Sequence, residues 1–83
     1  IFVTLDRPEH RQAFIDFVKA TPAIQECHHI TGEGDYLLKV RCTGTAALEQ
    51  ILSHGIKGLP GIRQTRTCIA LSTVKETTDL PLA

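Results

Sequence analysis

The chain has 83 residues, the size of one small domain, and its nine basic and nine acidic residues cancel to a formal net charge of zero. Because no cluster of Lys and Arg is interleaved with aromatic side chains, the chain has no electrostatic footprint for nucleic acid. No apolar stretch reaches the roughly 20 residues that cross a bilayer. We therefore expect a soluble, cytoplasmic protein without membrane contact.

The three cysteines, Cys27, Cys42 and Cys68, are odd in number and form no C-x-x-C pair. This argues against a secreted disulfide scaffold and favours small buried thiols. His28 and His29 follow Cys27 and suggest a metal site, but neighbouring strand residues point to opposite faces, so only one histidine can share a face with Cys27. We expect no metal ion and no cofactor.

A short apolar strand is predicted over residues 1–5. Asp6 is predicted to cap a helix that begins near Pro8, with Glu9 three residues after the cap. Thr21-Pro22 ends this helix. Its apolar positions recur on one stripe, at Phe14, Phe17 and Val18.

Residues 24–31 alternate with polar side chains, as in an exposed or edge strand, and another strand is predicted over residues 36–42. Between them lies a turn with two glycines and two carboxylates. Glycine allows close approach to the backbone, and Glu33 and Asp35 offer acceptors for an amine or a cation. The turn therefore suits a small polar ligand. The alternative is an ordinary hairpin turn with solubilising charges.

A second helix is predicted to begin at Thr43-Gly44-Thr45 and to end at the turn Leu59-Pro60-Gly61. Its apolar residues recur at helical spacing: Ala47, Leu48, Ile51, Leu52 and Ile56. Residues 62–74 are rich in β-branched side chains and predict a long final strand, followed by an extended tail over residues 75–83.

The predicted order is β-α-β-β-α-β, which is the α+β ferredoxin-like plan: a four-stranded antiparallel sheet with two helices on one face. The first, third and fourth predicted strands are apolar on both faces, as Leu37 beside Leu38 and the run Ile69-Ala70-Leu71 indicate. Because two helices cover only one face, we expect the other face to dimerise. The alternative is that these residues are scattered exposed apolar side chains.

Four segments taken together resemble the effector-binding (RAM) domain of the Lrp/AsnC, or feast/famine, family of transcriptional regulators. They are the run from Cys27 to Arg41, Leu59-Pro60-Gly61-Ile62, Thr65-Arg66-Thr67 and Val74-Lys75. The resemblance covers essentially the whole chain. Each segment alone is weak, but the combination at this spacing is specific.

The resemblance implies that residues 1–83 form one ligand-binding and oligomerisation domain of a non-enzymatic regulator of amino acid metabolism. It implies an amino acid or a related small molecule as effector, and a homodimer that assembles further, for example into an octamer. DNA would be bound only through an N-terminal helix-turn-helix domain, which these residues lack. A chain that begins at Ile1 rather than Met favours a shortened piece over a stand-alone domain.

The resemblance also implies a ligand site in a cleft between subunits, lined by the turn before the third strand and by the final strand. Carried onto this sequence, its residues are Thr31, Gly32, Gly34, Asp35, Tyr36, Thr65 and Thr67. A free amino acid presents an ammonium beside a carboxylate, so Asp35 and turn carbonyls suit the former, and backbone N–H groups and threonine hydroxyls the latter. Structural alternatives remain: Asp35 as a turn cap, Tyr36 as a core residue, and Thr65 and Thr67 as ordinary strand residues.

Two other functions are compatible with the same fold. One is an amino-acid-binding regulatory module of a metabolic enzyme, which an upstream DNA-binding domain would exclude. The other is a small dimeric oxygenase, which the absence of tryptophan and of an evident acid–base pair disfavours.

Overall fold

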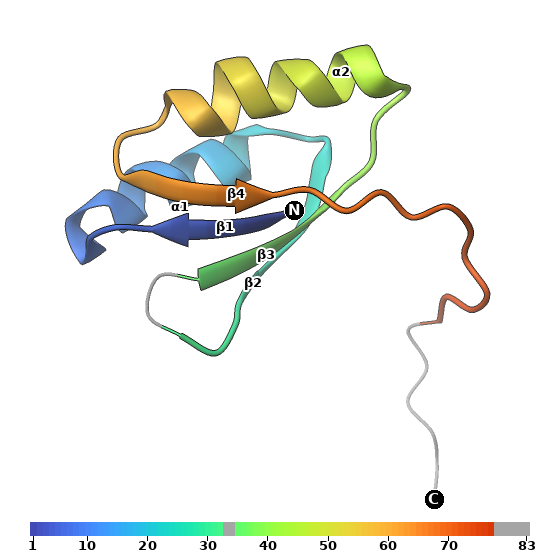
Figure 1. Ribbon diagram of the computed structural model, residues 1–83, viewed down its shortest axis with the longest axis horizontal. Helices are drawn as coiled ribbons and strands as arrows, with labels where there is room; N and C mark the ends of the chain where they lie inside the picture. Colours follow the sequence, from blue (N-terminus) through green and yellow to red (C-terminus); the bar gives the residue numbers. More distant parts are fainter. Residues whose placement is uncertain (33–34, 78–83) are drawn as a thin grey trace, which may run out of the picture.

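The computed structural model describes residues 1–32 and 35–77, which contain one four-stranded antiparallel sheet and two helical segments (Figure 1). The strands stand in the order β2-β3-β1-β4. Their bounds are β1 Phe2–Leu5, β2 Ile24–His29, β3 Asp35–Val40 and β4 Ile62–Arg66. The first helical segment consists of a 3₁₀ turn, η1 Pro8–His10, and α1 Arg11–Ala20. The second consists of α2 Thr45–Glu49, a π-helical segment η2 Gln50–Gly55, and a 3₁₀ turn η3 Ile56–Gly58.

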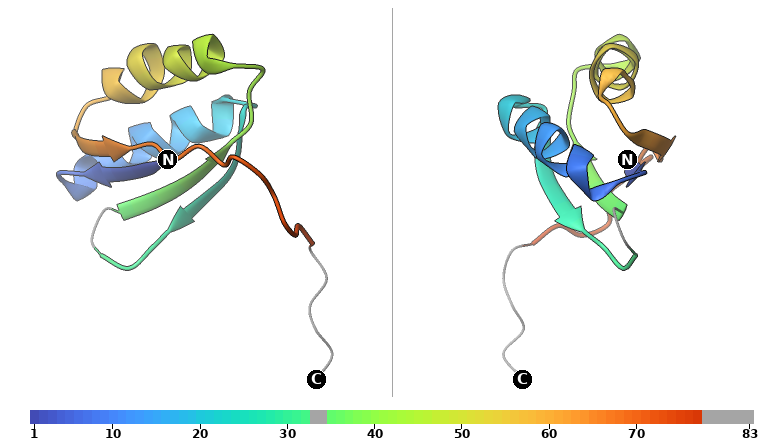
Figure 2. Two further views of the ribbon diagram at one scale, coloured as in Figure 1. Left: turned by 45° about the vertical axis from the view of Figure 1, so that its right-hand side comes forward. Right: turned by 90° about the vertical axis from the view of Figure 1, so that its left-hand side faces the viewer.

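Both helical segments lie on the same side of the sheet and form one layer (Figure 2), and the core is between this layer and the sheet. Phe14 of α1, Ile56 of η3 and Val3 of β1 are the largest fully buried side chains of this core. The other buried core residues are Ile1, Leu5, Ile24, Tyr36 and Leu38. The expected α+β ferredoxin-like arrangement is therefore confirmed, and the element order follows the sequence prediction.

The face of the sheet turned away from the helices, called here the outer face, is partly apolar. Residues opposite one another in a ladder share a face, and Phe2 pairs with Leu37 while buried Val3 pairs with buried Tyr36. The outer face carries Phe2, Thr4, Asp35, Leu37, Lys39, Gln64 and Arg66. The prediction of apolar residues on both faces is correct for β1 and β3, but β4 contributes polar side chains to the outer face.

The final strand is shorter than predicted, and it ends at Arg66 rather than at Val74. β4 is an edge strand whose only partner is β1, and Phe2, the first residue of β1, lies opposite Arg66. The β-branched run beyond Arg66 adopts no regular structure up to residue 77.

The start of the first helix also differs from the prediction. The N-cap is Arg7, without a side-chain hydrogen bond, and the Asp6 side chain lies 3.9 Å from Nε2 of His10. The Asp6 backbone N–H instead donates a 2.8 Å hydrogen bond to the carbonyl of Gly61, which ties the end of β1 to the loop before β4. The prediction that Asp6 caps the first helix is therefore wrong.

None of the helices in the described ranges has the length and apolar character required to span a membrane.

Candidate ligand-binding site

The turn before β3 brings Gly32 and Asp35 together. Gly32 has a φ of 109°, and a Cβ at this position would overlap the Asp35 carboxylate, so only glycine fits. The Ile30 N–H donates a 3.0 Å hydrogen bond to the Asp35 carbonyl, which closes the hairpin. Asp35 thus stands at a fixed point on the outer face. Glu33 and Gly34, the other residues of the predicted turn, lie outside the described residues.

Asp35 lines a hollow of about 250 Å³ on the outer face. Thr4 donates a 2.9 Å hydrogen bond from Oγ1 to Oδ1 of Asp35 across the β1–β3 ladder. The guanidinium of Arg66 lines the same hollow and lies 4.7 Å from the centre of the Phe2 ring, a cation–π distance. One carboxylate and one guanidinium therefore share a small cavity, which is the charge pattern complementary to a zwitterion.

Tyr36 belongs to the core rather than to an open site. Its side chain is 4% exposed, and its ring centre lies 4.9 Å from Phe14 and 5.0 Å from the His29 ring, which stacks on it. It is nevertheless among the residues that line the hollow. The structural interpretation of Tyr36 is therefore the better supported one.

The threonines do not join Asp35 within one chain. Thr31 is exposed beside the turn. Thr65 pairs with buried Val3, so it lies on the helix-covered side of the sheet, opposite to Asp35. Thr67 lies past the end of β4 and lines a different groove. The structure thus brings together Gly32 and Asp35, with Tyr36 behind them, and separates them from the final-strand residues.

Sequence reasoning missed three polar residues of the hollow: Thr4, Gln64 and Arg66. Thr4 lies between Asp35 on one neighbouring strand and Gln64 on the other, so the set is assembled by strand register. Arg66 stands inside the Thr65-Arg66-Thr67 segment. The alternation of that segment was the one available signal, because it places Arg66 on the face opposite to both threonines.

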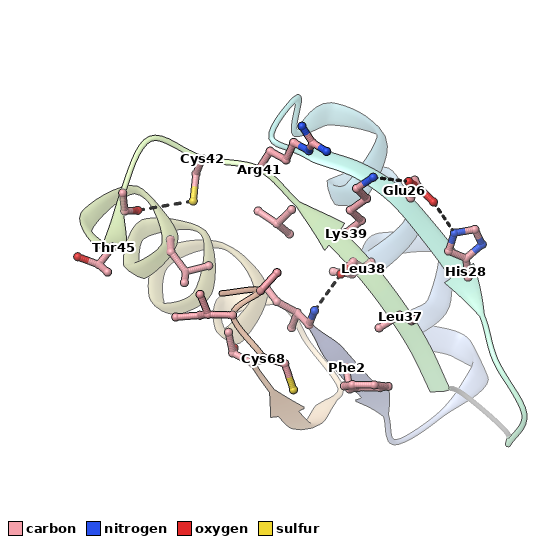
Figure 3. Close-up of a pocket in the computed structure, with 17 residues that line it drawn as sticks. Phe2, Glu26, His28, Leu37, Leu38, Lys39, Arg41, Cys42, Thr45 and Cys68 are labelled. Atoms are coloured by element: carbon pink, nitrogen blue, oxygen red, sulfur yellow. Dashed lines mark hydrogen bonds and ion pairs between the residues drawn. The ribbon is translucent and has the colours of Figure 1, made fainter. Parts of the chain in front are cut away.

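A larger groove of about 890 Å³ lies at the other end of the sheet, between the end of β3 and the segment that follows β4 (Figure 3). Ile1, Leu38 and Cys68 contribute apolar walls, and the Ile1 nitrogen donates a 2.8 Å hydrogen bond to the Leu38 carbonyl.

Lys39 of β3 and Arg41, just after β3, lie on the rim of this groove and bind Glu76. Arg41 Nη2 lies 2.7 Å and 2.9 Å from the two Glu76 oxygens, and Lys39 Nζ lies 3.2 Å from Glu76 and 3.2 Å from Glu26. The hydrogen bond from Arg41, and then that from Lys39, lowers the pKa of Glu76. The hydrogen bonds to Glu76 and Glu26 raise the pKa of Lys39. This cluster connects the segment after β4 to the outer face.

The two histidines considered for a metal site lie on opposite faces of the sheet, as the alternation of strand residues requires. His29 pairs with Tyr36 and Cys27 with Leu38, so both lie on the helix-covered side, whereas His28 accompanies Glu26 at 3.0 Å on the outer face. Burial raises the pKa of the Cys27 thiol. Within residues 1–32 and 35–77 no three metal-ligating side chains come together.

Known proteins resemble the chain over nearly its whole length. The family model described as the Lrp/AsnC ligand binding domain matches residues 1–80. The leucine-responsive regulatory protein of Haemophilus influenzae is 37% identical over 76 residues, 92% of this chain and 46% of the relative. Proteins of the same name from Klebsiella pneumoniae and Escherichia coli are each 36% identical over 80 residues, 94% of this chain and 49% of the relative.

The chain spans about half the length of these curated relatives. The names of these relatives describe regulatory proteins, and the family model describes a ligand-binding domain. The match of one family model to residues 1–80 and the identity to several regulators agree. The chain belongs to the Lrp/AsnC ligand-binding domain family.

Proposed function

We propose that the chain is the effector-sensing and oligomerisation domain of a transcriptional regulator of amino acid metabolism, and that it binds an amino acid or a related small molecule between subunits. The observation that carries this proposal is the placement of Asp35. It is a carboxylate fixed by Thr4 at the start of β3, beside a turn that only glycine can make, in a cavity that also holds a guanidinium.

The charges of the hollow suit the two ends of a free amino acid. Asp35 would accept hydrogen bonds from the ammonium through Oδ2, since Oδ1 already accepts one from Thr4. Arg66 would bind the carboxylate, because a guanidinium matches a carboxylate in charge and geometry. Within the described residues Arg66 makes no ion pair, so its charge is available to a ligand.

A second subunit completes the proposed site. Thr65 and Thr67 lie apart from Asp35 within one chain, so their proposed contact with ligand requires that the final strand of another subunit approach the turn. The outer face offers Phe2 and Leu37 for such an approach. The segment after β4 exposes further apolar side chains, with Leu71 at 96%. A homodimer, and a larger ring such as an octamer, would cover them.

An effector can regulate such an assembly only if it binds two states with different affinity. A ligand held between subunits meets this condition, because the complete site exists only where two subunits meet. DNA binding is assigned to a separate N-terminal domain of the full protein. The cytoplasm is the compartment in which we expect this regulator to act.

Native mass spectrometry with a panel of free amino acids tests both parts of the proposal, because it reports subunit number and bound ligand in one spectrum. The expected result is one or a few amino acids retained on a dimer or larger species. An amino acid at a hundred times its Kd should also stabilise the fold by about 2.7 kcal/mol, a melting shift of roughly 10 °C or more for a small domain.

Asp35→Asn should abolish most of that melting shift, because the amide keeps the shape and removes the charge. Asp16→Asn is the matched control, since Asp16 is an exposed carboxylate on α1 that only accepts a hydrogen bond from Gln12. Retention of the full shift by Asp35→Asn would remove Asp35 from the site. A panel that gives neither bound amino acid nor melting shift would overturn the proposed effector class.

A further inference from the structure

A second hollow, of about 520 Å³, lies where β1 ends and η1 begins, and it is strongly basic. Arg7, Arg11 and Arg63 line it, together with Asp6, His29 and Tyr36. These three arginines are a third of the nine basic residues of a chain whose net charge is zero. Asp6 is the one carboxylate among the described residues of the lining, so positive charge is in excess there. This set is called the basic hollow below.

Arg7 precedes η1 as its N-cap residue, Arg11 begins α1 and Arg63 lies in β4, where a strand irregularity places it. Thr4 pairs with Gln64 but Leu5 pairs with Ile62, so Arg63 is an extra residue of β4 without a ladder partner. Such bulges redirect a side chain, and they are frequent beside functional sites. Arg11 comes from the first turn of α1.

The charges of the basic hollow are largely uncompensated. Arg7 lies 3.4 Å from Glu9, an exposed pair that contributes little. Neither Arg11 nor Arg63 makes an ion pair or a side-chain hydrogen bond within the described residues. With three arginines and one carboxylate, Asp6, in its described lining, the basic hollow carries excess positive charge that an anion would neutralise. The site therefore favours an oxyanion with more than one negative charge.

We propose that the basic hollow binds the phosphate group of a small molecule. A phosphate monoester carries about −1.5 to −2 charges at neutral pH and three acceptor oxygens, which matches three guanidinium groups better than a carboxylate does. The volume is that of a small-ligand pocket. His29, stacked on Tyr36 at 5.0 Å, offers a flat surface beside the phosphate position. A nucleic acid backbone would need a basic stripe rather than one concave cluster.

Titration calorimetry of the whole chain with inorganic phosphate and with phenyl phosphate, at fixed ionic strength, tests this site. Arg63→Gln and Arg11→Gln should each weaken binding by about tenfold or more, the effect of losing hydrogen bonds to a charged group. Lys57→Gln is the matched control: it removes one positive charge from an exposed residue outside the basic hollow, and should leave affinity within about twofold. Arg63→Lys should recover only part of the loss, because Lys cannot bind two oxygens at once.

Chemical shifts of the His29 and Arg63 side chains should move on phosphate addition and identify the location. Tighter binding of phenyl phosphate than of inorganic phosphate would show that the ring adds contacts, and equal binding would assign the affinity to the phosphate alone; both results support the site. Equal losses in Arg63→Gln and Lys57→Gln, or no binding by the folded wild type, would overturn it. Binding of duplex DNA that requires Arg63 and is not competed by phosphate would also overturn the proposal, in favour of a nucleic acid contact.

Discussion

Thr4 and Asp35 face each other across the β1–β3 ladder, and Thr4 Oγ1 donates a 2.9 Å hydrogen bond to Asp35 Oδ1. This bond fixes the Asp35 carboxylate in one orientation on the outer face. The hydrogen bond occupies Oδ1 of Asp35. The other oxygen, Oδ2, lies where a side chain of Gly32 would begin. A strand residue far away in sequence therefore orients the Asp35 carboxylate.

Replacing Thr4 by Val should weaken effector binding by roughly threefold to tenfold and the fold by about 0.5–1.5 kcal/mol, because the half-buried Asp35 loses its donor. Calorimetry with the effector and thermal unfolding measure the two effects. Thr4→Ser keeps the hydroxyl and is the control. If Thr4→Ser lost as much affinity as Thr4→Val, the hydrogen bond would not be the cause.

The exposed apolar residues after β4 should hold subunits together. Leu71 and Val74 are 96% and 99% exposed, so the double change Leu71→Ser, Val74→Ser costs the single subunit no packing. We expect the wild type to be at least dimeric at micromolar concentration and the double variant to dissociate at least about a hundredfold more readily. Analytical ultracentrifugation measures this, with Ala46→Ser on exposed α2 as control. A wild-type monomer in light scattering would contradict the prediction.

Gly61 should tolerate no side chain. Its φ is 78°, and a Cβ there would overlap the His10 ring, so Gly61→Ala should cost about 1–3 kcal/mol. Gly58→Ala is the control, because nothing lies within 4 Å of its Cβ position, and it should be neutral or stabilising by up to about 1 kcal/mol. Urea unfolding measures both variants. His10→Ala added to Gly61→Ala should recover the part of the loss that is steric. Equal stability of the two glycine variants would refute this reasoning.

The contact between Glu76 and the pair Lys39 and Arg41 should be pH-dependent. Hydrogen bonds from Arg41 and Lys39 lower the pKa of Glu76 in the folded state, so the contact is complete above the ordinary glutamate value of about 4.3 and is lost as pH falls through the lowered pKa. The amide hydrogens of residues 67 to 77 should then lose protection, measured relative to the intrinsic exchange rate at each pH. Glu76→Gln should give fast exchange already at neutral pH, and high salt should act in the same direction. Slow exchange in Glu76→Gln would show that the ion pairs do not hold the segment.

The sequence determined the local elements and the turn. Alternation and helical spacing indicated the order of strands and helices, and the glycines with Asp35 indicated a constrained turn, because these signals depend on neighbours within a few residues. The four segments from Cys27 to Lys75 also indicated the family that the comparison confirms. Local pattern could not set the end of β4, since the length of an edge strand depends on its partner.

Which side chains meet depends on the strand order and register of the folded chain. The strand order β2-β3-β1-β4 puts Thr4 between Asp35 and Gln64, and the register places Arg66 on the face of Asp35 while Thr65 faces the helices. The irregularity that gives Arg63 no ladder partner likewise arises from the pairing of β1 with β4. A shift of one residue in register would reverse every side chain, and register is fixed by long-range packing of the sheet on its helices. That is why the turn could be predicted from its own residues, whereas the cavity around it could not.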